Sequence, residues 1–483
     1  METEHSNIDK CTDENEEIST ENAVVENNLI DNENKNISTD NILNGDNEVN
    51  KTENDVDEVK LPSEDVEMTE NVQISSRDSN EVISATETQD DTLATNTGTL
   101  TFINYSFDNI FELTKSTKPF NVDTFLYGCK WSPDGTCLLT NCADYTIRLF
   151  DLPQNLYNKQ IWNKNETLPE LVPSLKMSEG GQIYDYDWYP FMSSWYPETC
   201  SFLTTSSKAT IHLWDAYVAK ILATYRGYNR FDETANAYSV KFSLNGEKIF
   251  SGYENEVKIF DTLRPGRDFV NIDTKHVAGQ SGIISCIAEN PSVPNMFAAG
   301  SYKKTIGLYL ESGDSICLLS GQRSGITYLM WSQDGTCLYS GARKDNEIIC
   351  WDIRNPGEVL CTMERTVNTN QRIYFDLSPD GRYLISGNTT GELTVWDLHD
   401  TIDESGKRNV AFQYRPHLDC ANGISIHRQL PILATSSGQR HVPDITSDDE
   451  EDNHIFDTKK MMSKIENSIK LWWIGPVQTE PVD

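Results

Sequence analysis

The stretch Gly128-Cys129-Lys130-Trp131-Ser132-Pro133-Asp134-Gly135, followed by Thr146-Ile147-Arg148-Leu149-Phe150-Asp151, decides how this sequence folds. Variants recur downstream, at Leu329-Met330-Trp331-Ser332-Gln333-Asp334-Gly335 with Cys350-Trp351-Asp352, and at Phe375-Asp376-Leu377-Ser378-Pro379-Asp380-Gly381 with Val395-Trp396-Asp397. Each copy predicts a strand, a tight turn, a second strand, a second turn and a third strand. A repeated β unit, rather than any single segment, therefore sets the architecture.

Seven third-strand endings of this kind align along the chain. They are Phe150-Asp151, Trp214-Asp215, Phe260-Asp261, Tyr309-Leu310, Trp351-Asp352, Trp396-Asp397 and Trp472-Trp473. Four of the six intervals between them are 42, 45, 46 and 49 residues, close to the roughly 40–45 residues of a four-stranded propeller blade. The two longer intervals predict insertions, at residues 153–178 and about 442–467. The sequence predicts an all-β fold, a seven-bladed WD-repeat β-propeller.

A ring of blades must close, because a single small sheet cannot bury both of its faces. Two short apolar runs, at residues 102–107 and 110–113, precede the first complete unit. We expect one of them to form the outer strand of the seventh blade, so that truncation there unfolds the domain. The predicted organisation is a tail at 1–99, a propeller at 100–476 with the acidic insertion at about 442–467 in its last blade, and a C-terminal tail at 477–483.

The negative charge of the chain is concentrated outside the predicted blades. The net charge is −35, and residues 1–100 contain 27 acidic and 5 basic residues with no aromatic residue. Such a composition predicts a disordered tail, because too little apolar surface is available to offset the entropy of ordering. A second run, residues 444–457, holds seven acidic residues and no basic one. The propeller itself is nearly balanced, so the bulk charge does not exclude a nucleic-acid partner.

Motifs for membranes, metals, cofactors and catalysis are absent from the sequence. No apolar stretch approaches the roughly 18 residues of a membrane span, and the acidic start does not resemble a signal peptide. The eleven cysteines lack the closely spaced Cys and His pairs of a zinc site. No phosphate-binding loop, zinc-protease motif or nucleophile elbow is found. We expect a soluble non-enzyme without a cofactor, whose loops bind a partner.

The loops expected on one face of the propeller carry a concentration of basic, aromatic and amide side chains. In a propeller, the turns between second and third strands and the connectors between blades open onto the same face. The candidate RNA-binding residues there are Lys303, Lys304, Arg323, Arg343, Lys344, Arg372, Arg440, Tyr302, Tyr374, Gln280, Gln371 and Gln439. Cations suit phosphates, aromatic rings suit unstacked bases and amides suit base edges. Basic loops also bind acidic peptides, so a protein partner stays open at this point.

The same region resembles, over roughly residues 100–475, the telomerase Cajal body protein 1 family of WD-repeat proteins. Matching strings include Arg264-Pro265-Gly266-Arg267-Asp268, Gly279-Gln280-Ser281-Gly282-Ile283-Ile284-Ser285-Cys286, Ser340-Gly341-Ala342-Arg343-Lys344-Asp345, Thr369-Asn370-Gln371-Arg372-Ile373-Tyr374-Phe375-Asp376 and Ala434-Thr435-Ser436-Ser437-Gly438-Gln439-Arg440. These strings are far more specific than the Trp-Asp signature, which many unrelated adaptor proteins share.

The resemblance implies a non-catalytic RNA-binding factor. It implies recognition of the CAB-box loop of small Cajal body RNAs, of H/ACA and C/D type, and of telomerase RNA where that RNA is of the same type. The implied partners are box H/ACA ribonucleoprotein proteins, Cajal body proteins such as coilin, and the cytosolic chaperonin for folding. The implied location is the nucleus and its Cajal bodies, with some protein in the cytoplasm. The alternative is a WD-repeat adaptor between proteins, in a ubiquitin-ligase or chromatin complex, without an RNA client.

One departure from the usual WD repeat concerns the blade joints, where Gln stands at positions that are often His. The loss of His is expected to remove an internal hydrogen-bond network and to lower the intrinsic stability of the blades.

Overall fold

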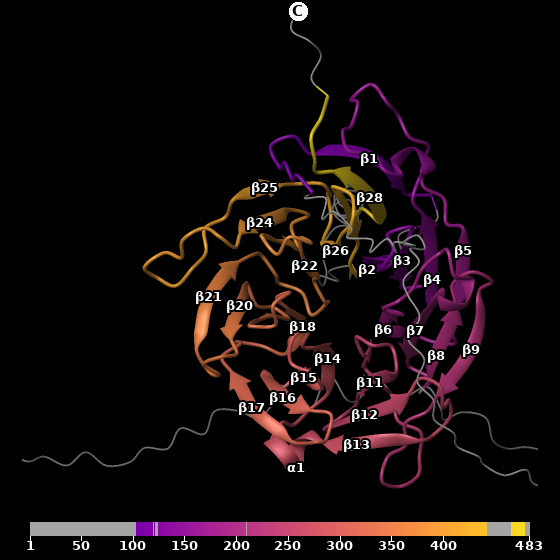
Figure 1. Ribbon diagram of the computed structural model, residues 1–483, viewed down its shortest axis with the longest axis vertical. Helices are drawn as coiled ribbons and strands as arrows, with labels where there is room; N and C mark the ends of the chain where they lie inside the picture. The colour runs from indigo at the N-terminus through magenta and orange to yellow at the C-terminus, as the bar shows by residue number, and fades with distance from the viewer. Residues whose placement is uncertain (1–102, 119, 121–123, 209, 442–464, 479–483) are drawn as a thin grey trace, which may run out of the picture. The chain divides into compact units, whose positions relative to one another are not determined.

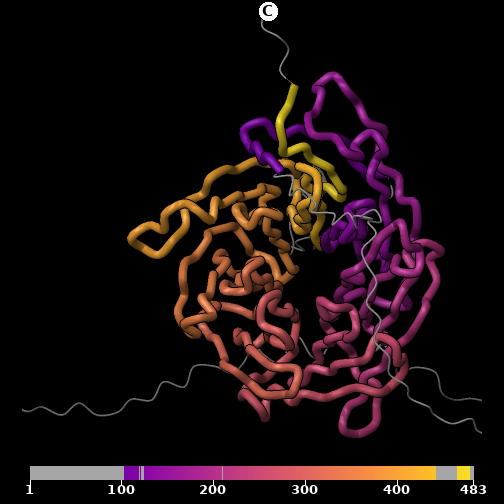
Figure 2. Tube along the Cα trace, viewed as in Figure 1, coloured from indigo at the N-terminus to yellow at the C-terminus, as the bar shows by residue number. Residues whose placement is uncertain are grey.

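The computed structural model describes residues 103–118, 120, 124–208, 210–441 and 465–478. All of them belong to one compact unit, Thr95–Asp483. Within this part of the chain the strands form seven sheets of four strands each, arranged around a central space (Figure 1). The tube in Figure 2 follows the chain once around this ring, from indigo to yellow. The predicted seven-bladed β-propeller is confirmed, whereas the acidic tail and residues 442–464 of the insertion lie outside the described residues.

The blades are numbered along the chain, and each is built from its innermost strand outward. Blade 1 contains β2 (Leu126–Trp131), β3 (Cys137–Cys142), β4 (Thr146–Asp151) and β5 (Leu175–Ser178), and blade 2 contains β6 (Ile183–Trp188), β7 (Ser201–Ser206), β8 (Ile211–Asp215) and β9 (Lys220–Tyr225). Blade 3 contains β10 (Ser239–Phe242), β11 (Lys248–Gly252), β12 (Glu256–Asp261) and β13 (Phe269–Asp273), and blade 4 contains β14 (Ile284–Glu289), β15 (Met296–Ser301), β16 (Thr305–Leu310) and β17 (Ser315–Ser320).

The remaining three blades repeat the pattern. Blade 5 contains β18 (Ile326–Trp331), β19 (Cys337–Ala342), β20 (Glu347–Asp352) and β21 (Val359–Glu364), and blade 6 contains β22 (Phe375–Leu377), β23 (Tyr383–Gly387), β24 (Leu393–Asp397) and β25 (Phe412–Tyr414). Blade 7 contains β26 (Ala421–Ile426), β27 (Ile432–Ser437), β28 (Ser468–Trp473) and β1 (Phe111–Ser116). Three short helices lie in the connections: η1 (Gln154–Leu156), η2 (Pro197–Thr199) and α1 (Thr274–Ala278).

Local sequence explains the hairpin at the start of each unit. In blade 1 the turn glycine Gly135 adopts φ 75°, a left-handed conformation in which a Cβ is unfavourable. The neighbouring Asp134 carboxylate accepts hydrogen bonds from the Ser132 hydroxyl at 2.6 Å and the Thr136 amide at 3.1 Å. The seven aligned endings all fall at the ends of third strands, as the spacing predicted.

The ring closes by pairing the first strand with the last. β1 lies antiparallel to β28, with Phe111 opposite Trp473 and Ser116 opposite Ile469. The second of the two predicted apolar runs thus begins the closing strand, and the first packs beside it, since the Ser106 amide donates to the Ile474 carbonyl at 2.8 Å. The prediction of an N-terminal strand that closes the seventh blade is confirmed.

The first insertion is shorter than predicted, because β5 is the outer strand of blade 1. The insertion therefore covers residues 153–174, and it packs against the closing strand. Trp162 is fully buried between Phe111 and Trp473, with ring centroids 6.2 and 6.1 Å away. The Leu171 amide donates to the Lys115 carbonyl of β1 at 3.0 Å. The insertion thus secures the strand that closes the ring.

The hydrophobic core is divided among the joints between blades. Each pair of neighbouring blades encloses its own cluster of buried side chains. Inner strands are also joined by side chains that cap the backbone of the next blade. Asp185 accepts from the Val240 amide at 3.2 Å, and Asp376 accepts from the Ile426 amide at 2.8 Å. No blade is therefore complete without its neighbours.

The expected loss of the internal hydrogen-bond network is wrong. In blade 5 the Gln322 carbonyl oxygen accepts from the Ser340 hydroxyl at 3.0 Å, and that hydroxyl accepts from the Trp351 indole at 2.8 Å. The Gln322 amide nitrogen donates to the Asp345 carboxylate at 3.2 Å. In blade 2 the Glu179 carboxylate accepts a hydrogen bond from the Trp214 indole at 2.9 Å. In these two blades an amide and a carboxylate therefore supply the acceptors of the network, while blade 7 keeps a histidine, His417, bonded to Thr435 at 2.7 Å.

Candidate nucleic-acid interface

Turns and connectors meet on one face of the ring, as the sequence predicted. In blade after blade, the turn between the second and third strands donates a backbone hydrogen bond to the connector before the inner strand. These bonds run from Ala143 to Phe125 (2.9 Å), from Ser207 to Gln182 (2.9 Å), from Tyr302 to Ile283 (3.0 Å) and from Arg343 to Gly325 (3.0 Å). We call this surface the rim face. Every loop discussed below belongs to it unless stated otherwise.

Four of the predicted cations are exposed on the rim face and have no acidic partner among the residues that the structure describes. They are Lys303, Lys304, Lys344 and Arg440. Arg323 is exposed as well, but it pairs with Glu347 at 3.1 Å. Unpaired ammonium and guanidinium groups on a common face attract a polyanion.

Arg343 joins this cationic group to an aromatic ring. Its guanidinium carbon lies 3.5 Å from the centroid of the Tyr302 ring, which is close contact for a cation–π pair. The Arg343 Nε is buried without a hydrogen-bond partner among the described residues, while Tyr302 is 36% exposed. The pair thus presents a flat surface between blades 4 and 5.

Two of the exposed lysines occupy strained backbone positions. Lys304 has φ 70° and Lys344 has φ 48°, in the left-handed region that Lys rarely adopts. In blades 3 and 6 the corresponding turns place Asn255 and Gly391 at positive φ, residue types that tolerate it well. Strain retained at exposed positions is typical of functional loops.

Arg372 and Tyr374 do not belong to the open surface, which corrects the prediction for both. The Arg372 guanidinium extends across the central space, donating to Asp185 of blade 2 and to the Ser285 carbonyl of blade 4, each at 2.8 Å. It also donates to the Tyr374 hydroxyl at 3.1 Å. Burial lowers the pKa of Arg372, but the Asp185 carboxylate together with Tyr374, Tyr302 and Cys286 outweighs that effect, so the pKa lies well above its usual value. Burial raises the pKa of Tyr374 to about 12.

The three predicted amides all donate hydrogen bonds to other parts of the protein. Gln280 is fully buried, donating to the Ala299 carbonyl at 2.8 Å and accepting from the Tyr309 hydroxyl at 2.8 Å. Gln371 donates to the Gly438 carbonyl at 3.1 Å. Gln439 donates to the buried Asp419 at 2.7 Å. The burial of Gln280 corrects its assignment as a base-reading group, whereas Gln371 and Gln439 are half-buried and their assignment stays a prediction.

Sequence reasoning missed three tyrosines on the rim face, at equivalent places in three consecutive inner strands. Tyr127 and Tyr184 sit at β-bulges near the start of β2 and β6, and Tyr238 immediately precedes β10. The Tyr184 and Tyr238 rings lie 5.2 Å apart at 35°. Burial, followed by the proximity of the Tyr238 and Tyr302 hydroxyls, raises the pKa of Tyr184. The sequence did contain a signal for this group, because a tyrosine recurs at the start of three consecutive inner strands.

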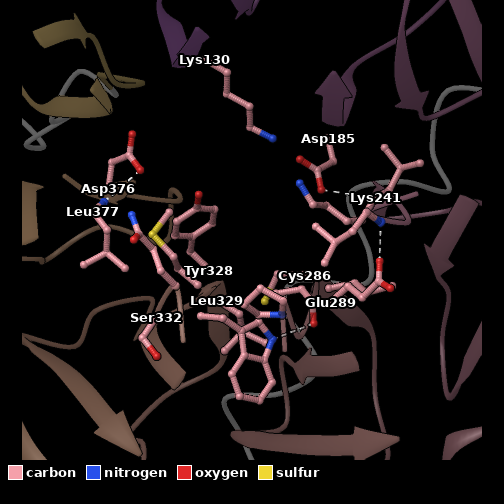
Figure 3. Close-up of a pocket in the computed structure, with 18 of the residues that line it drawn as sticks. Lys130, Asp185, Lys241, Cys286, Glu289, Tyr328, Leu329, Ser332, Asp376 and Leu377 are labelled. Carbon is pink, nitrogen blue, oxygen red and sulfur yellow. Dashed lines mark hydrogen bonds between the residues drawn. The ribbon is translucent and has the colours of Figure 1, made fainter. Parts of the chain in front are cut away.

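A separate cavity, lined by both charged and apolar side chains, lies inside the ring (Figure 3), with a volume of about 280 Å³. Lys130 extends into it from one side, with Asp185 and Asp376 on the neighbouring walls. Its charges are largely compensated, since Lys241 pairs with Asp187 at 2.9 Å and Lys130 donates to the Tyr186 carbonyl at 2.5 Å. This compensation makes the cavity a weaker candidate for a polyanion than the rim face.

No helix in the described part of the chain is long and apolar enough to cross a lipid bilayer. No group of three or more His, Cys, Asp or Glu side chains among the same residues is placed to hold a metal ion.

Comparison with known proteins gives consistent matches. The family described as WD domain, G-beta repeat matches residues 116–151 and 313–352. The chain is 43% identical over 393 residues to telomerase Cajal body protein 1 of Mus musculus, which covers 79% of this chain and 73% of that protein. The protein of the same name from Mesocricetus auratus is 41% identical, covering 87% and 80%. That from Homo sapiens is 42% identical, covering 77% and 68%.

Proposed function

The chain belongs to the telomerase Cajal body protein 1 family, and from that premise we propose that it is a non-catalytic RNA-binding scaffold. It recognises the CAB-box loop of small Cajal body RNAs and directs the ribonucleoprotein to Cajal bodies. The family relationship supports the association with Cajal bodies and telomerase. The rim face supports the recognition of RNA.

One observation carries the RNA proposal: Lys303, Lys304, Lys344 and Arg440 are exposed and unpaired within the described part of the chain, next to the stacked Arg343 and Tyr302. Single-stranded RNA is bound by cations that follow its backbone and by planar groups on which its bases stack. The four cations form no ion pair among the described residues, and part of the Tyr302 ring is exposed. Both are therefore available to a ligand.

The proposal includes the partners and the location. The clients are H/ACA-type and C/D-type small Cajal body RNAs, and telomerase RNA where it is of that type. Box H/ACA proteins and Cajal body proteins such as coilin accompany the complex in the nucleus. The cytosolic chaperonin assists folding, because strands from opposite ends of the chain must pair to close the ring. A cytoplasmic fraction follows from that step.

The test is the binding of a fluorescently labelled stem–loop RNA with a CAB-box loop. The combined substitution Lys303→Glu and Lys344→Glu should weaken binding at least tenfold and leave the thermal melt unchanged, because both side chains are exposed. The matched control, Lys220→Glu with Arg264→Glu, changes exposed cations on the opposite face and should bind like wild type. Wild-type affinity in the first variant would overturn the rim assignment.

The adaptor alternative is favoured by a different observation. The loop between β6 and β7, on the face opposite the rim, exposes Phe191, Trp195 and Tyr196 by 57%, 87% and 61%. Exposed aromatic groups on a structured loop suit a protein partner. Crosslinking and sequencing of RNA bound in cells separates the two functions. Enrichment of small Cajal body RNAs supports the RNA scaffold, whereas a background profile supports the adaptor.

A further inference from the structure

The two sides of the rim face differ in chemistry. The unpaired lysines and Arg343 lie on blades 4 and 5, where they can hold phosphates. Over blade 3 lies a recess of about 900 Å³, lined on one side by Tyr238, Asn236 and Glu254. Among its other charged groups, Arg230 pairs with Asp273 at 2.7 Å. Lys275 also lines the recess and is exposed without an ion pair among the described residues, so Glu254 is what distinguishes the recess from the lysines of blades 4 and 5.

Glu254 places a negative charge in the recess near Tyr238. This carboxylate is exposed and has no ion pair among the described residues. It lies close enough to Tyr238 to raise the pKa of that hydroxyl, second to the effect of burial. A free carboxylate repels phosphate, but it accepts hydrogen bonds from the amino groups of nucleobases. The surroundings of Tyr238 thus suit the edge of a base better than the RNA backbone.

Tyr238, which lies near Glu254, packs against Tyr184 before any ligand binds. Tyr184 and Tyr238 lie against each other at 5.2 Å, and both are half-buried, so part of each ring stays accessible. The Tyr238 amide donates to the Gly252 carbonyl at 2.7 Å, and Tyr184 occupies the bulge of β6 between the paired residues Ile183 and Asp185. Rigid aromatic rings bind a base with little loss of conformational entropy.

We propose that one unpaired RNA base stacks on the Tyr184–Tyr238 pair, with an amino-bearing edge directed at Glu254, while the adjoining phosphates contact the cations of blades 4 and 5. This inference rests on the proposed function and names the subsite that separates base recognition from backbone binding. A base with an amino group, adenine, cytosine or guanine, is preferred there over uracil.

The first experiment is an abasic scan of the stem–loop RNA, combined with Tyr184→Ala in the full chain. Wild type should show one loop position at which loss of the base weakens binding about tenfold. Tyr184→Ala should weaken binding of the intact loop by a similar factor and show no further loss with that abasic RNA, because the two changes remove the same contact. Tyr184→Phe keeps the ring and should bind like wild type. Trp195→Ala, an exposed aromatic on the opposite face, is the matched control.

The second experiment tests whether Glu254 favours a base with an amino group over uracil. With each of the four bases at the position found by the scan, wild type should bind uracil several-fold more weakly than the others. Glu254→Ala should remove that difference, while Glu247→Ala, an exposed carboxylate on the opposite face, should retain it. A preference unchanged in Glu254→Ala would overturn the role of this carboxylate.

The outcomes separate this inference from the proposed function. If charge reversal at Lys303 and Lys344 abolishes binding, but all loop positions tolerate abasic substitution, the base subsite is wrong and the RNA scaffold stands. If wild type does not bind the loop RNA at all, both are overturned. Should Tyr184→Ala fail to fold in a thermal melt, Tyr238→Ala and the abasic scan of wild type decide the question.

Discussion

At the scale of the residue, Lys304 shows how function and stability oppose each other on the rim face. A lysine at φ 70° costs roughly 1 kcal/mol relative to a residue that tolerates the left-handed region. Lys304→Asn should therefore raise the free energy of unfolding by about 0.5 kcal/mol and weaken RNA binding, since a cation is lost. Its matched control is Lys303→Asn, at a position with ordinary φ, which should weaken binding without stabilising. Denaturation midpoints and RNA affinities of the two variants check this, and equal midpoints would contradict it.

His427 links blade 7 to the first turn of blade 1 and makes stability depend on pH. Its Nδ1 accepts from the Gln429 and Leu430 amides, each at 3.0 Å, so its Nε2 donates to the Gly135 carbonyl at 2.9 Å. Burial lowers the pKa of this imidazole from 6.5 to about 4. Between these values the unfolded chain binds a proton that the folded protein excludes. The stabilisation is therefore complete above pH 6.5 and decreases as pH falls toward 4, by up to about 3 kcal/mol.

The measurement is the thermal midpoint from pH 7.5 to pH 4.5. The thermal midpoint of wild type should fall over this interval. The midpoint of His427→Gln should be lower at pH 7.5 but should change less with pH. If both proteins lose the same number of degrees, another group controls the acid sensitivity.

At the scale of the element, the closing strand β1 depends on the insertion that covers it. Trp162 is fully buried against Phe111 and Trp473, so Trp162→Ala should lower the free energy of unfolding by about 3–5 kcal/mol. Trp195→Ala removes a side chain that is 87% exposed and should change it by less than about 0.5 kcal/mol. Chemical denaturation and protease cleavage within β1 check the difference. Equal effects of the two substitutions would show that the insertion does not secure the ring.

At the scale of the whole molecule, the acidic tail and the basic rim face carry opposite charge. Residues 1–98 contain 27 acidic and 5 basic residues, enough to compete with RNA for the rim cations at low ionic strength. Deleting residues 1–98 should raise non-specific RNA affinity at low salt, and the gain should shrink toward 0.2 M salt as screening increases. A neutral Gly/Ser tail of the same length is the control. Unchanged affinity after deletion would show that the tail does not screen the rim face.

Local patterns in the sequence are sufficient to predict the number of blades, the ends of their third strands and the exposed lysines of the turns. Turn residues, alternating burial and an aromatic-acidic ending repeat within each unit of about 45 residues. Lys303, Lys304 and Lys344 lie on turns whose exposure follows from the same pattern. The sequence-based fold was confirmed on this basis.

Which of the other rim side chains face outward depends on how the blades pack together. Arg372 pairs with Asp185, 187 positions away, and Gln280, Gln371 and Gln439 hydrogen-bond to other parts of the fold. Tyr184 and Tyr238 become neighbours because two inner strands converge at the centre of the ring. The reason is physical: propensity and turn chemistry act over a few residues, whereas the partner of a long polar side chain depends on how blades distant in sequence pack together.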